Sequence, residues 1–411
     1  MRTDTPPRRV VLTGLGSVNA AGADVAGSWA RVRAGTSCLS SISRFDTAGY
    51  PIRVAGEMPA FDPAVGVPRR FLAKTDRFTH LAFAAVDEAL RDGKLDLAAT
   101  DRSRVGVWFG NNTGGWDLCE RGFREYYGNG PDTVNPWQAT AWFLAAPQGF
   151  LTIRHGLRGM SKSFSGDRAS GAATLYHAMR AISRGRVDTV IAGGCEAPLS
   201  PLSLLCFHSN GELSERGDPA TAYRPYDVDA SGTVLGEGAA AVLLEDEDAV
   251  LRRGGRVHAV VLGGAHGTAP AEQVCGYGDV LRRALADAGC GPGDIDLVIG
   301  DGAGQYDADQ IEAAAVAAAF AGRGEPVPLA TPKAVYGHLY GAAFCADVIC
   351  GALAARDSVV PGTAGFRNGL LPEGVTVTGT ERAAPVRRFM VCTRSRYGSC
   401  VAMVFAAPGT A

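Results

Sequence analysis

The sequence predicts an α/β protein in which helices cover a buried, mainly parallel sheet. Three observations support this prediction. β-rich runs alternate with runs that carry apolar residues at helical spacing, glycine turns separate many of them, and the pattern begins again near residue 250. The 411 residues could form two or three domains or one large fold built from a duplicated unit, and the lack of a proline-rich linker favours one shared core.

The first half of the chain supplies strands and one long helix in order. Residues 10–13 form a buried strand that leads through two glycines into a turn. Residues 75–93 carry apolar side chains at helical spacing and stop at a glycine, so we expect a helix there. Residues 104–115 and 189–197 each resemble a strand with a glycine turn, and residues 232–255 a strand followed by a helix.

The second half repeats this alternation. Residues 257–267 are expected to form a strand, residues 276–304 a helix and then a strand, and residues 308–322 a helix. The long helical runs between short apolar strands are typical of layered α/β proteins.

Composition excludes several classes of function. The formal net charge of -2 and the absence of a polybasic block argue against nucleic acid and membrane surfaces as partners. No apolar run is long enough to span a bilayer, and the N-terminal region lacks the core of a signal peptide, so we expect a cytoplasmic protein. The ten cysteines show no C-x-x-C spacing, which indicates buried free thiols and no metal site, and no phosphate-binding glycine motif indicates a nucleotide.

The stretch SKSFSGDRASGAATLYHAM, residues 161–179, places an arginine where an enzyme could hold a nucleophile. A short β run meets a sharp turn of small residues and then a helix, so Arg168 lies near the positive end of a helix dipole. A thiol at such a position would be activated. A guanidinium there is electrostatically unfavourable and needs an acidic partner or solvent.

The turn GDRASG resembles the T-A-C-[ST]-S-G turn that carries the nucleophile in the ketosynthases of fatty acid and polyketide synthesis, members of the thiolase superfamily. Further motifs follow in the family's order over nearly the whole chain: RVVLTGLG, AGGCEA, RPYDVDASGTVLGEGAAAVLLED and TPKAVYGHLYGAA. The resemblance implies a thiolase-like fold of two duplicated halves in an α/β/α/β/α arrangement, with residues 1–250 in one half and 251–411 in the other.

The chain departs from this family at its catalytic positions. Arg168 stands in place of the cysteine, and in DGAGQYDADQIE Asp301 replaces the first histidine. The remaining positions of the family's site are retained: Lys333, His338, Asp309 and Glu312. The C-terminal loop, which is rich in phenylalanine and glycine in the family, has become CTRSRYGSC. Without a thiolate no acyl-enzyme can form, so we expect no catalytic residue in this degenerate site.

This pattern of losses resembles one subfamily, the chain length factors or ketosynthase β subunits of type II polyketide synthases, which usually carry glutamine at the position of Arg168. The resemblance implies a heterodimer with a catalytic ketosynthase α subunit, in which malonyl units arrive on an acyl carrier protein. It also implies a growing polyketide chain in a shared tunnel. The chain would need no cofactor of its own, because the carrier protein brings the phosphopantetheine arm.

Two ion pairs are expected in the degenerate site. In the family the positions of Arg168 and Asp301 face each other, so we expect them to pair; another acid, such as Asp167 or Asp309, or a solvent or interface role are the alternatives. Lys333 is expected to pair with Glu312, as a structural remnant that holds two loops together.

Trp116, Cys119 and Phe123 recur at spacings that place them on one helical face. They could form a core stripe. The resemblance instead places them on the helix that lines the tunnel and limits product length, and two large aromatic side chains there imply a short or narrow tunnel.

Two other functions stay open at this stage. The chain could use His338, Lys333 or a nearby thiol to decarboxylate a substrate or transfer an acyl group. It could also be an acyl-binding scaffold that forms a homodimer.

Overall fold

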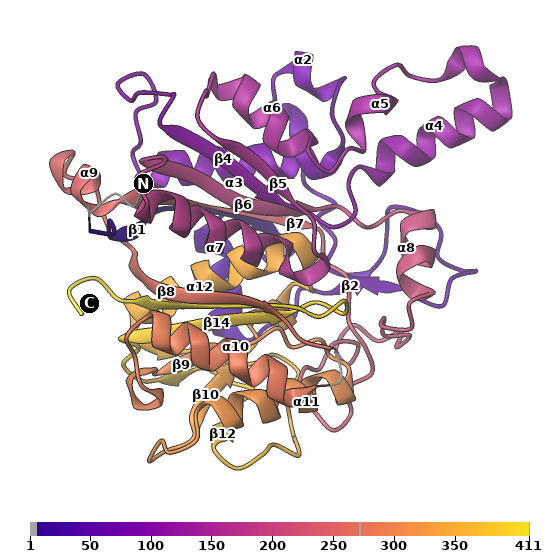
Figure 1. Ribbon diagram of the computed structural model, residues 1–411. Helices are drawn as coiled ribbons and strands as arrows, with labels where there is room; N and C mark the ends of the chain where they lie inside the picture. The colour runs from indigo at the N-terminus through magenta and orange to yellow at the C-terminus, as the bar shows by residue number, and fades with distance from the viewer. Residues whose placement is uncertain (1–5, 271–272, 411) are drawn as a thin grey trace.

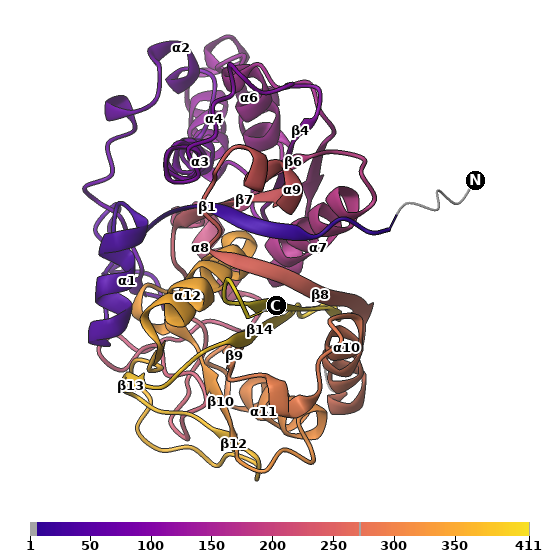
Figure 2. The same ribbon diagram turned by 90° about the vertical axis from the view of Figure 1, so that its left-hand side faces the viewer.

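The computed structural model describes residues 6–270 and 273–410, and this part of the chain forms a main sheet of 11 strands flanked by helices (Figure 1). The strand order is β12-β10-β9-β14-β15-β8-β1-β7-β6-β4-β5. Strands β1 and β8 meet in the middle, where Val10–Leu12 pair with residues 259–261 (Figure 2).

Each half of the chain contributes one half of this sheet. The first half supplies β1 (Val10–Asn19), β4 (Val105–Gly110), β5 (Ser161–Phe164), β6 (Thr189–Glu196) and β7 (Gly238–Asp246). The second half supplies β8 (Ala259–Thr268), β9 (Leu297–Ile299), β10 (Val327–Ala330), β14 (Arg388–Arg394) and β15 (Ser399–Ala406), with the short β12 (Val375–Thr376) at the edge. The order β5-β4-β6-β7-β1 and the order β10-β9-β14-β15-β8 follow the same path along each half, which confirms the duplicated fold.

The sheet is not mainly parallel, as the sequence led us to expect. Within the described residues, β7 runs antiparallel to β1 and β6, and β15 runs antiparallel to β8 and β14. The contact between β1 and β8 is antiparallel as well. Every residue of β7 is buried. A strand covered on both faces is a continuous apolar run in either direction, so its sequence does not reveal its orientation.

Helices and sheet halves alternate in five layers, which Figure 1 shows from top to bottom. Helix α3 (Arg77–Asp92) covers the outer face of the first half, and α10 (Val274–Asp287) and α11 (Tyr306–Ala319) cover the second. Between the halves lie α7 (Ser170–Ser183) and α12 (Ala343–Asp357), whose apolar side chains join both halves in one core. Because α12 is enclosed by protein, its sequence is apolar on nearly every face.

Strand β1 is longer than predicted. The two glycines expected in a turn, Gly14 and Gly16, lie inside the strand. A Cβ atom at either position would collide with the backbone of α3, at Ala89 and Ala85 respectively. These glycines therefore permit α3 to pack closely against the sheet.

The other elements lie at the ends and sides of the layers. The remaining helices are α1 (Val25–Ala34), α2 (Arg69–Leu72), α4 (Trp116–Asn129), α5 (Gln138–Ala141), α6 (Ala146–His155), α8 (Pro201–His208) and α9 (Glu247–Arg252). Two small ladders pair β2 (Ser40–Ser41) with β3 (Val54–Ala55) and β11 (Val359–Val360) with β13 (Arg382–Ala383). Short 3-10 turns cover Pro63–Val65, Pro131–Thr133, Asp167–Ala169, Pro292–Asp294, Pro332–Val335 and Tyr340–Ala342. Helix α4 extends away from the layers with α5 beside its base (Figure 1).

Three further sequence expectations concern side chains and membranes. All ten cysteines are free thiols, but Cys206 and Cys275 are exposed, so the expectation of buried thiols is wrong for these two. No helix in the described ranges has the length and apolar character needed to cross a membrane. Within the same ranges, no three His, Cys, Asp or Glu side chains lie close enough together to hold a metal ion.

Candidate functional site: a degenerate active site

The turn that carries Arg168 is a tight elbow between β5 and α7. Asp167 adopts a left-handed backbone conformation with φ of 57°, which is uncommon for a residue with a side chain. Ser170 stabilises the elbow, because its hydroxyl donates to the carbonyl oxygen of Asp167 at 2.6 Å and accepts from the backbone N–H of Gly166 at 2.9 Å. The elbow directs Arg168 into the protein, where the residue is 4% exposed.

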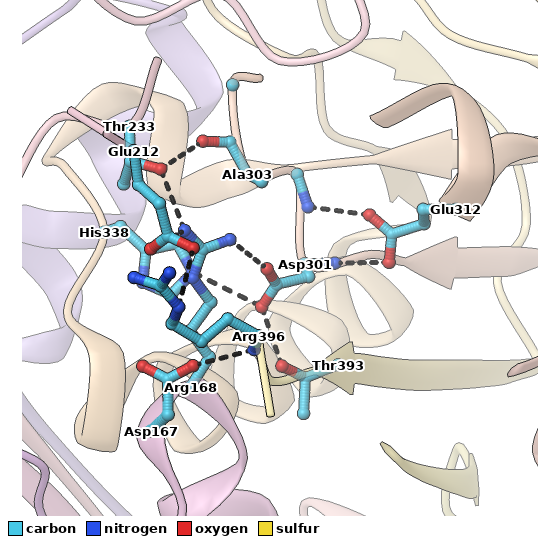
Figure 3. Close-up of polar contacts among 12 residues, drawn as sticks. Asp167, Arg168, Glu212, Thr233, Asp301, Ala303, Glu312, His338, Thr393 and Arg396 are labelled. Atoms are coloured by element: carbon cyan, nitrogen blue, oxygen red, sulfur yellow. Dashed lines mark hydrogen bonds and ion pairs between the residues drawn. The ribbon is translucent and has the colours of Figure 1, made fainter. Parts of the chain in front are cut away.

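Arg168 binds three side chains from three different segments (Figure 3). Its Nη1 atom donates to Oδ2 of Asp301 at 3.1 Å. Its Nη2 atom lies 3.0 Å from Oγ1 of Thr233 and 3.3 Å from Oε2 of Glu212. The expected pair with Asp301 is therefore confirmed, and Glu212 is a second acidic partner that the sequence did not reveal.

Asp167 and Asp309, the alternative partners, bind backbone groups. The Asp167 carboxylate accepts the N–H of Arg396 at 3.0 Å, and the Asp309 carboxylate accepts the N–H of Tyr226 at 2.8 Å. Burial raises the pKa of Asp309 to about 8. Neither carboxylate is thus the ion-pair partner of the guanidinium.

Asp301 has both carboxylate oxygens occupied. Besides Arg168 on Oδ2, its Oδ1 atom accepts the hydroxyl of Thr393 at 2.7 Å and lies 3.3 Å from Nε2 of His338. Burial alone would raise the pKa of this carboxyl, but His338, Arg168 and Lys333 together hold it well below its usual range. The ionised carboxylate therefore matches the charge of Arg168.

His338 is held in one tautomer. Its Nδ1 atom accepts the backbone N–H of Tyr340 at 3.0 Å, so Nε2 carries the proton and donates to Asp301. Burial lowers the pKa of His338 to about 4, although Asp301 acts in the opposite direction. The imidazole is neutral at physiological pH, and both of its nitrogens are engaged within the protein.

The expected ion pair between Lys333 and Glu312 is wrong. The Nζ atom of Lys333 donates to Oδ2 of Asp347 at 2.7 Å and to the carbonyl oxygens of Gly300 and Asp301 at 2.8 and 3.0 Å. Glu312 instead accepts the backbone N–H groups of Asp301 and Gly302, at 2.9 and 2.8 Å. The Glu312 carboxylate thus fixes the loop that carries Asp301, and Lys333 neutralises a different acid.

Asp347 could have been found from the sequence. It lies in the second turn of the apolar helix α12 and is 2% exposed. A carboxylate buried in such a helix needs a cation or a proton. Burial raises the pKa of Asp347 to about 7, and Lys333 opposes that shift. Glu212 and Thr393 carried no comparable signal, because they come from loop and strand positions that only the fold brings to Arg168 and Asp301.

Neither of the two thiols near the site is activated. Cys345 lies behind the elbow, with its Sγ atom 3.9 Å from the carbonyl oxygen of Gly171, and Cys392 lies 4.0 Å from a carboxylate oxygen of Glu312. Burial raises the pKa of both thiols above the usual range, so they stay protonated. The charged groups of the site are paired with one another, Arg168 with Asp301 and Glu212, and Lys333 with Asp347.

The face formed by Trp116, Cys119 and Phe123 changes environment along α4. Trp116 is half-buried at the first position of the helix, Cys119 is buried, and Phe123 is 46% exposed. A core stripe would bury all three, so that interpretation fits only the beginning of the helix. Tyr126 and Tyr127 continue the exposed aromatic surface toward the end of α4.

Comparison with known proteins identifies the family. The family description "Beta-ketoacyl synthase, N-terminal domain" matches residues 7–249, and "Beta-ketoacyl synthase, C-terminal domain" matches residues 256–367. The "Tetracenomycin polyketide synthase ketoacyl synthase beta subunit" of Streptomyces glaucescens is 39% identical over 366 residues, which cover 87% of this chain and 88% of that protein. The "3-oxoacyl-[acyl-carrier-protein] synthase 2" of Coxiella burnetii is 32% identical, with 88% of this chain and 89% of that protein covered.

A solved structure described as "The ishigamide ketosynthase/chain length factor" has the same fold. It superposes with a TM-score of 0.90 at 27% identity and covers 98% of this chain and 100% of its own.

Proposed function

The chain belongs to the beta-ketoacyl synthase family, among the β subunits or chain length factors of type II polyketide synthases, and from this premise we propose that it is the non-acylating subunit of a ketosynthase heterodimer. Its catalytic partner would form the acyl thioester, and this chain would complete the tunnel and help to set the product length.

The observation that carries this proposal is the position of Arg168. A ketosynthase needs a thiolate at this elbow to accept an acyl group. Here a guanidinium occupies the position and is closed in by Asp301, Glu212 and Thr233. Although burial opposes its charge, Tyr340 and the surrounding carboxylates raise the pKa of Arg168, so it stays a cation without nucleophilic character.

The surface around α4 supports a partner subunit. Phe123, Tyr126 and Tyr127 on α4 and Trp142 and Phe143 just after α5 are exposed aromatic side chains. A cluster of this kind on a folded protein marks a protein interface. In the described residues β5 pairs only with β4, so its outer edge is also open to another chain.

In the proposed complex, the partner's cysteine carries the growing acyl chain and an acyl carrier protein brings malonyl units. Loss of carbon dioxide from malonyl generates the carbon nucleophile, which attacks the acyl thioester, forms the new carbon–carbon bond and releases the partner's thiolate. Trp116, Cys119 and Phe123 would line the path of the product and limit its length. The complex would act in the cytoplasm, and this chain would bind no cofactor of its own.

The geometry gives no support to an independent decarboxylase or acyltransferase. His338 has both ring nitrogens engaged, and Lys333 has three acceptors within 3.0 Å. A base or nucleophile needs a free lone pair within reach of the substrate.

Purification of a tagged copy from a producing host tests the proposal, with native mass determination of what accompanies it. A cysteine-bearing ketosynthase at one-to-one stoichiometry is the expected result. Recovery as a homodimer would refute the heterodimer and favour the acyl-binding scaffold. Release of carbon dioxide from malonyl carrier protein by the purified chain, abolished by His338→Ala, would instead establish a decarboxylase.

A further inference from the structure

Helix α4 is attached to the body of the protein through its beginning. Leu118, Cys119, Glu120 and Gly122 are buried, whereas from Phe123 onward the side chains are exposed or half-buried. The direction of the helix is therefore determined by contacts in its first two turns. Two of the three proposed gate residues, Trp116 and Cys119, belong to this attached part.

Asp76 connects this part of α4 to helix α3. Its backbone carbonyl oxygen accepts the N–H groups of Thr79 and His80, at 3.0 and 3.2 Å, and so begins α3. Its side chain turns to the other helix, where Oδ2 accepts the N–H of Leu118 at 2.6 Å. Leu118 lies two positions after Trp116 and directly before Cys119. One residue thus binds the beginnings of both helices.

Helix α3 is a firm base for this contact. Its side chains Phe78, Leu81, Phe83 and Val86 are completely buried against the first half of the sheet. A carboxylate attached to such a helix has little freedom, and its hydrogen bond to the first turn of α4 satisfies a backbone donor that the helix itself leaves open.

The surroundings of Asp76 are costly for a carboxylate. The residue is 3% exposed, and its Oδ1 atom has no hydrogen-bond partner within the described residues. It borders a cavity of about 350 Å³ that is also lined by Arg44, Arg77, His80, Asp117 and Arg121. Arg44 is bound to Asp117 at 2.5 Å. A half-satisfied buried carboxylate costs stability, which favours a role in specifying geometry over a role in stabilising the fold.

We propose that Asp76 is a positioning residue for the product-length gate, because it fixes the first turn of α4 and with it Trp116 and Cys119. The proposal rests on the gate assigned to these residues above. Loss of the contact between Asp76 and Leu118 would let the attached part of α4 move. The tunnel at Trp116 would then become wider, and its width would vary.

A pair of substitutions separates this role from general stability. Asp76→Ser keeps a side chain that can begin α3, but the shorter side chain does not reach Leu118. Asp76→Asn keeps an oxygen at the right distance for the N–H of Leu118 and removes only the charge. Asp24→Ser is the matched control, because Asp24 accepts the N–H of Gly27 at 2.7 Å at the start of α1, away from α4.

Each variant would be studied in the complex with its catalytic partner by amide hydrogen exchange and by mass analysis of the products. In Asp76→Ser, exchange in residues 116–122 should be about fivefold faster, the ratio expected for loss of one helix cap. The share of longer products should rise several-fold. Asp76→Asn should stay near the wild type in both measurements, and Asp24→Ser should leave α4 unchanged.

Unchanged exchange in Asp76→Ser would overturn the proposal whatever the products show. Faster exchange with unchanged products would also overturn it, provided that Trp116→Ala does change product length; the proposed function would then still stand. If Trp116→Ala has no effect on product length either, the gate in the proposed function is refuted, and this proposal fails with it.

Discussion

Replacement of Arg168 by methionine would remove its charge while keeping much of its length. Asp301, which is 5% exposed, would lose one partner and keep only Thr393 and His338. Glu212 would be less affected for two reasons. Its Oε1 atom lies 3.7 Å from Nε of Arg396, and the Glu212 side chain is 13% exposed to solvent. Breaking a buried ion pair from one side typically costs about 3–5 kcal/mol of unfolding free energy. Most of this loss in unfolding free energy should come from the Asp301 carboxylate, which would be left buried without its cation.

A double-mutant cycle isolates this contribution. Arg168→Met, Asp301→Asn and the double variant would be unfolded by denaturant in the complex at fixed concentration. Because Asp301→Asn removes the charge that Arg168→Met leaves unpaired, the double variant should lose about 1–3 kcal/mol less than the two single losses added together.

The matched control is Arg282→Met, which breaks an exposed pair with Asp279 on α10. Its side chains are 47% and 60% exposed, and we expect a loss of at most about 0.5 kcal/mol. If Arg168→Met costs no more than this control, or if the two single losses add within about 0.5 kcal/mol, the closed ion pair does not hold the site together.

Three other predictions concern catalysis, product length and pH. Arg168→Cys should not acquire an acyl group from acyl carrier protein, because Asp301 stands where a histidine is needed and His338 is engaged; intact mass analysis would show a stoichiometric acyl adduct if this is wrong. Trp116→Ala should lengthen the product, whereas Val65→Ala, at an exposed apolar position outside α4, should not; product masses that match the wild type for both variants would contradict gating. Burial raises the pKa of Glu196 to about 7, so the folded protein binds a proton that the unfolded chain releases at lower pH, and stability is lost as pH rises from about 4.5 to 7. Glu196→Gln should remove about 2.5 kcal/mol of the change in unfolding free energy between pH 5 and pH 8, which denaturant unfolding at the two pH values would measure; the same change in unfolding free energy in both proteins would contradict it.

Much of the fold and part of the site could be predicted from the sequence. The alternation of strands and helices predicted a layered α/β protein, and the resemblance to the ketosynthases implied the duplicated halves and the pair between Arg168 and Asp301. The direction of β7 and β15 could not be inferred from the sequence. A strand that is buried on both faces is apolar at nearly every position, so its pattern does not show whether the neighbouring strands are parallel or antiparallel. Glu212 was missed because it lies in a loop between α8 and β7, and no sequence motif connects that loop to Arg168.

The error at Lys333 has a different origin. Glu312 was a reasonable partner by charge, but its oxygens accept the backbone N–H groups of the loop that carries Asp301. Every residue except proline has a backbone N–H group, so the residue types do not show which of these groups a carboxylate will bind. An ion pair between two motifs can therefore be predicted from charge. Whether a carboxylate binds a backbone N–H group in place of that partner is seen only in the structure.

The partners of Arg168 also set an order of events during synthesis. They lie 44, 65 and 133 positions further along the chain, at Glu212, Thr233 and Asp301. At a translation rate of about 5–20 residues per second, Asp301 is made roughly 7 to 27 seconds after Arg168.

During this interval Arg168 can meet Glu212 and Thr233, but its partner from the second half, Asp301, has not yet been made. The position that holds the nucleophile in ketosynthases therefore carries a contact between the two halves of this chain, from Arg168 in the first half to Asp301 in the second.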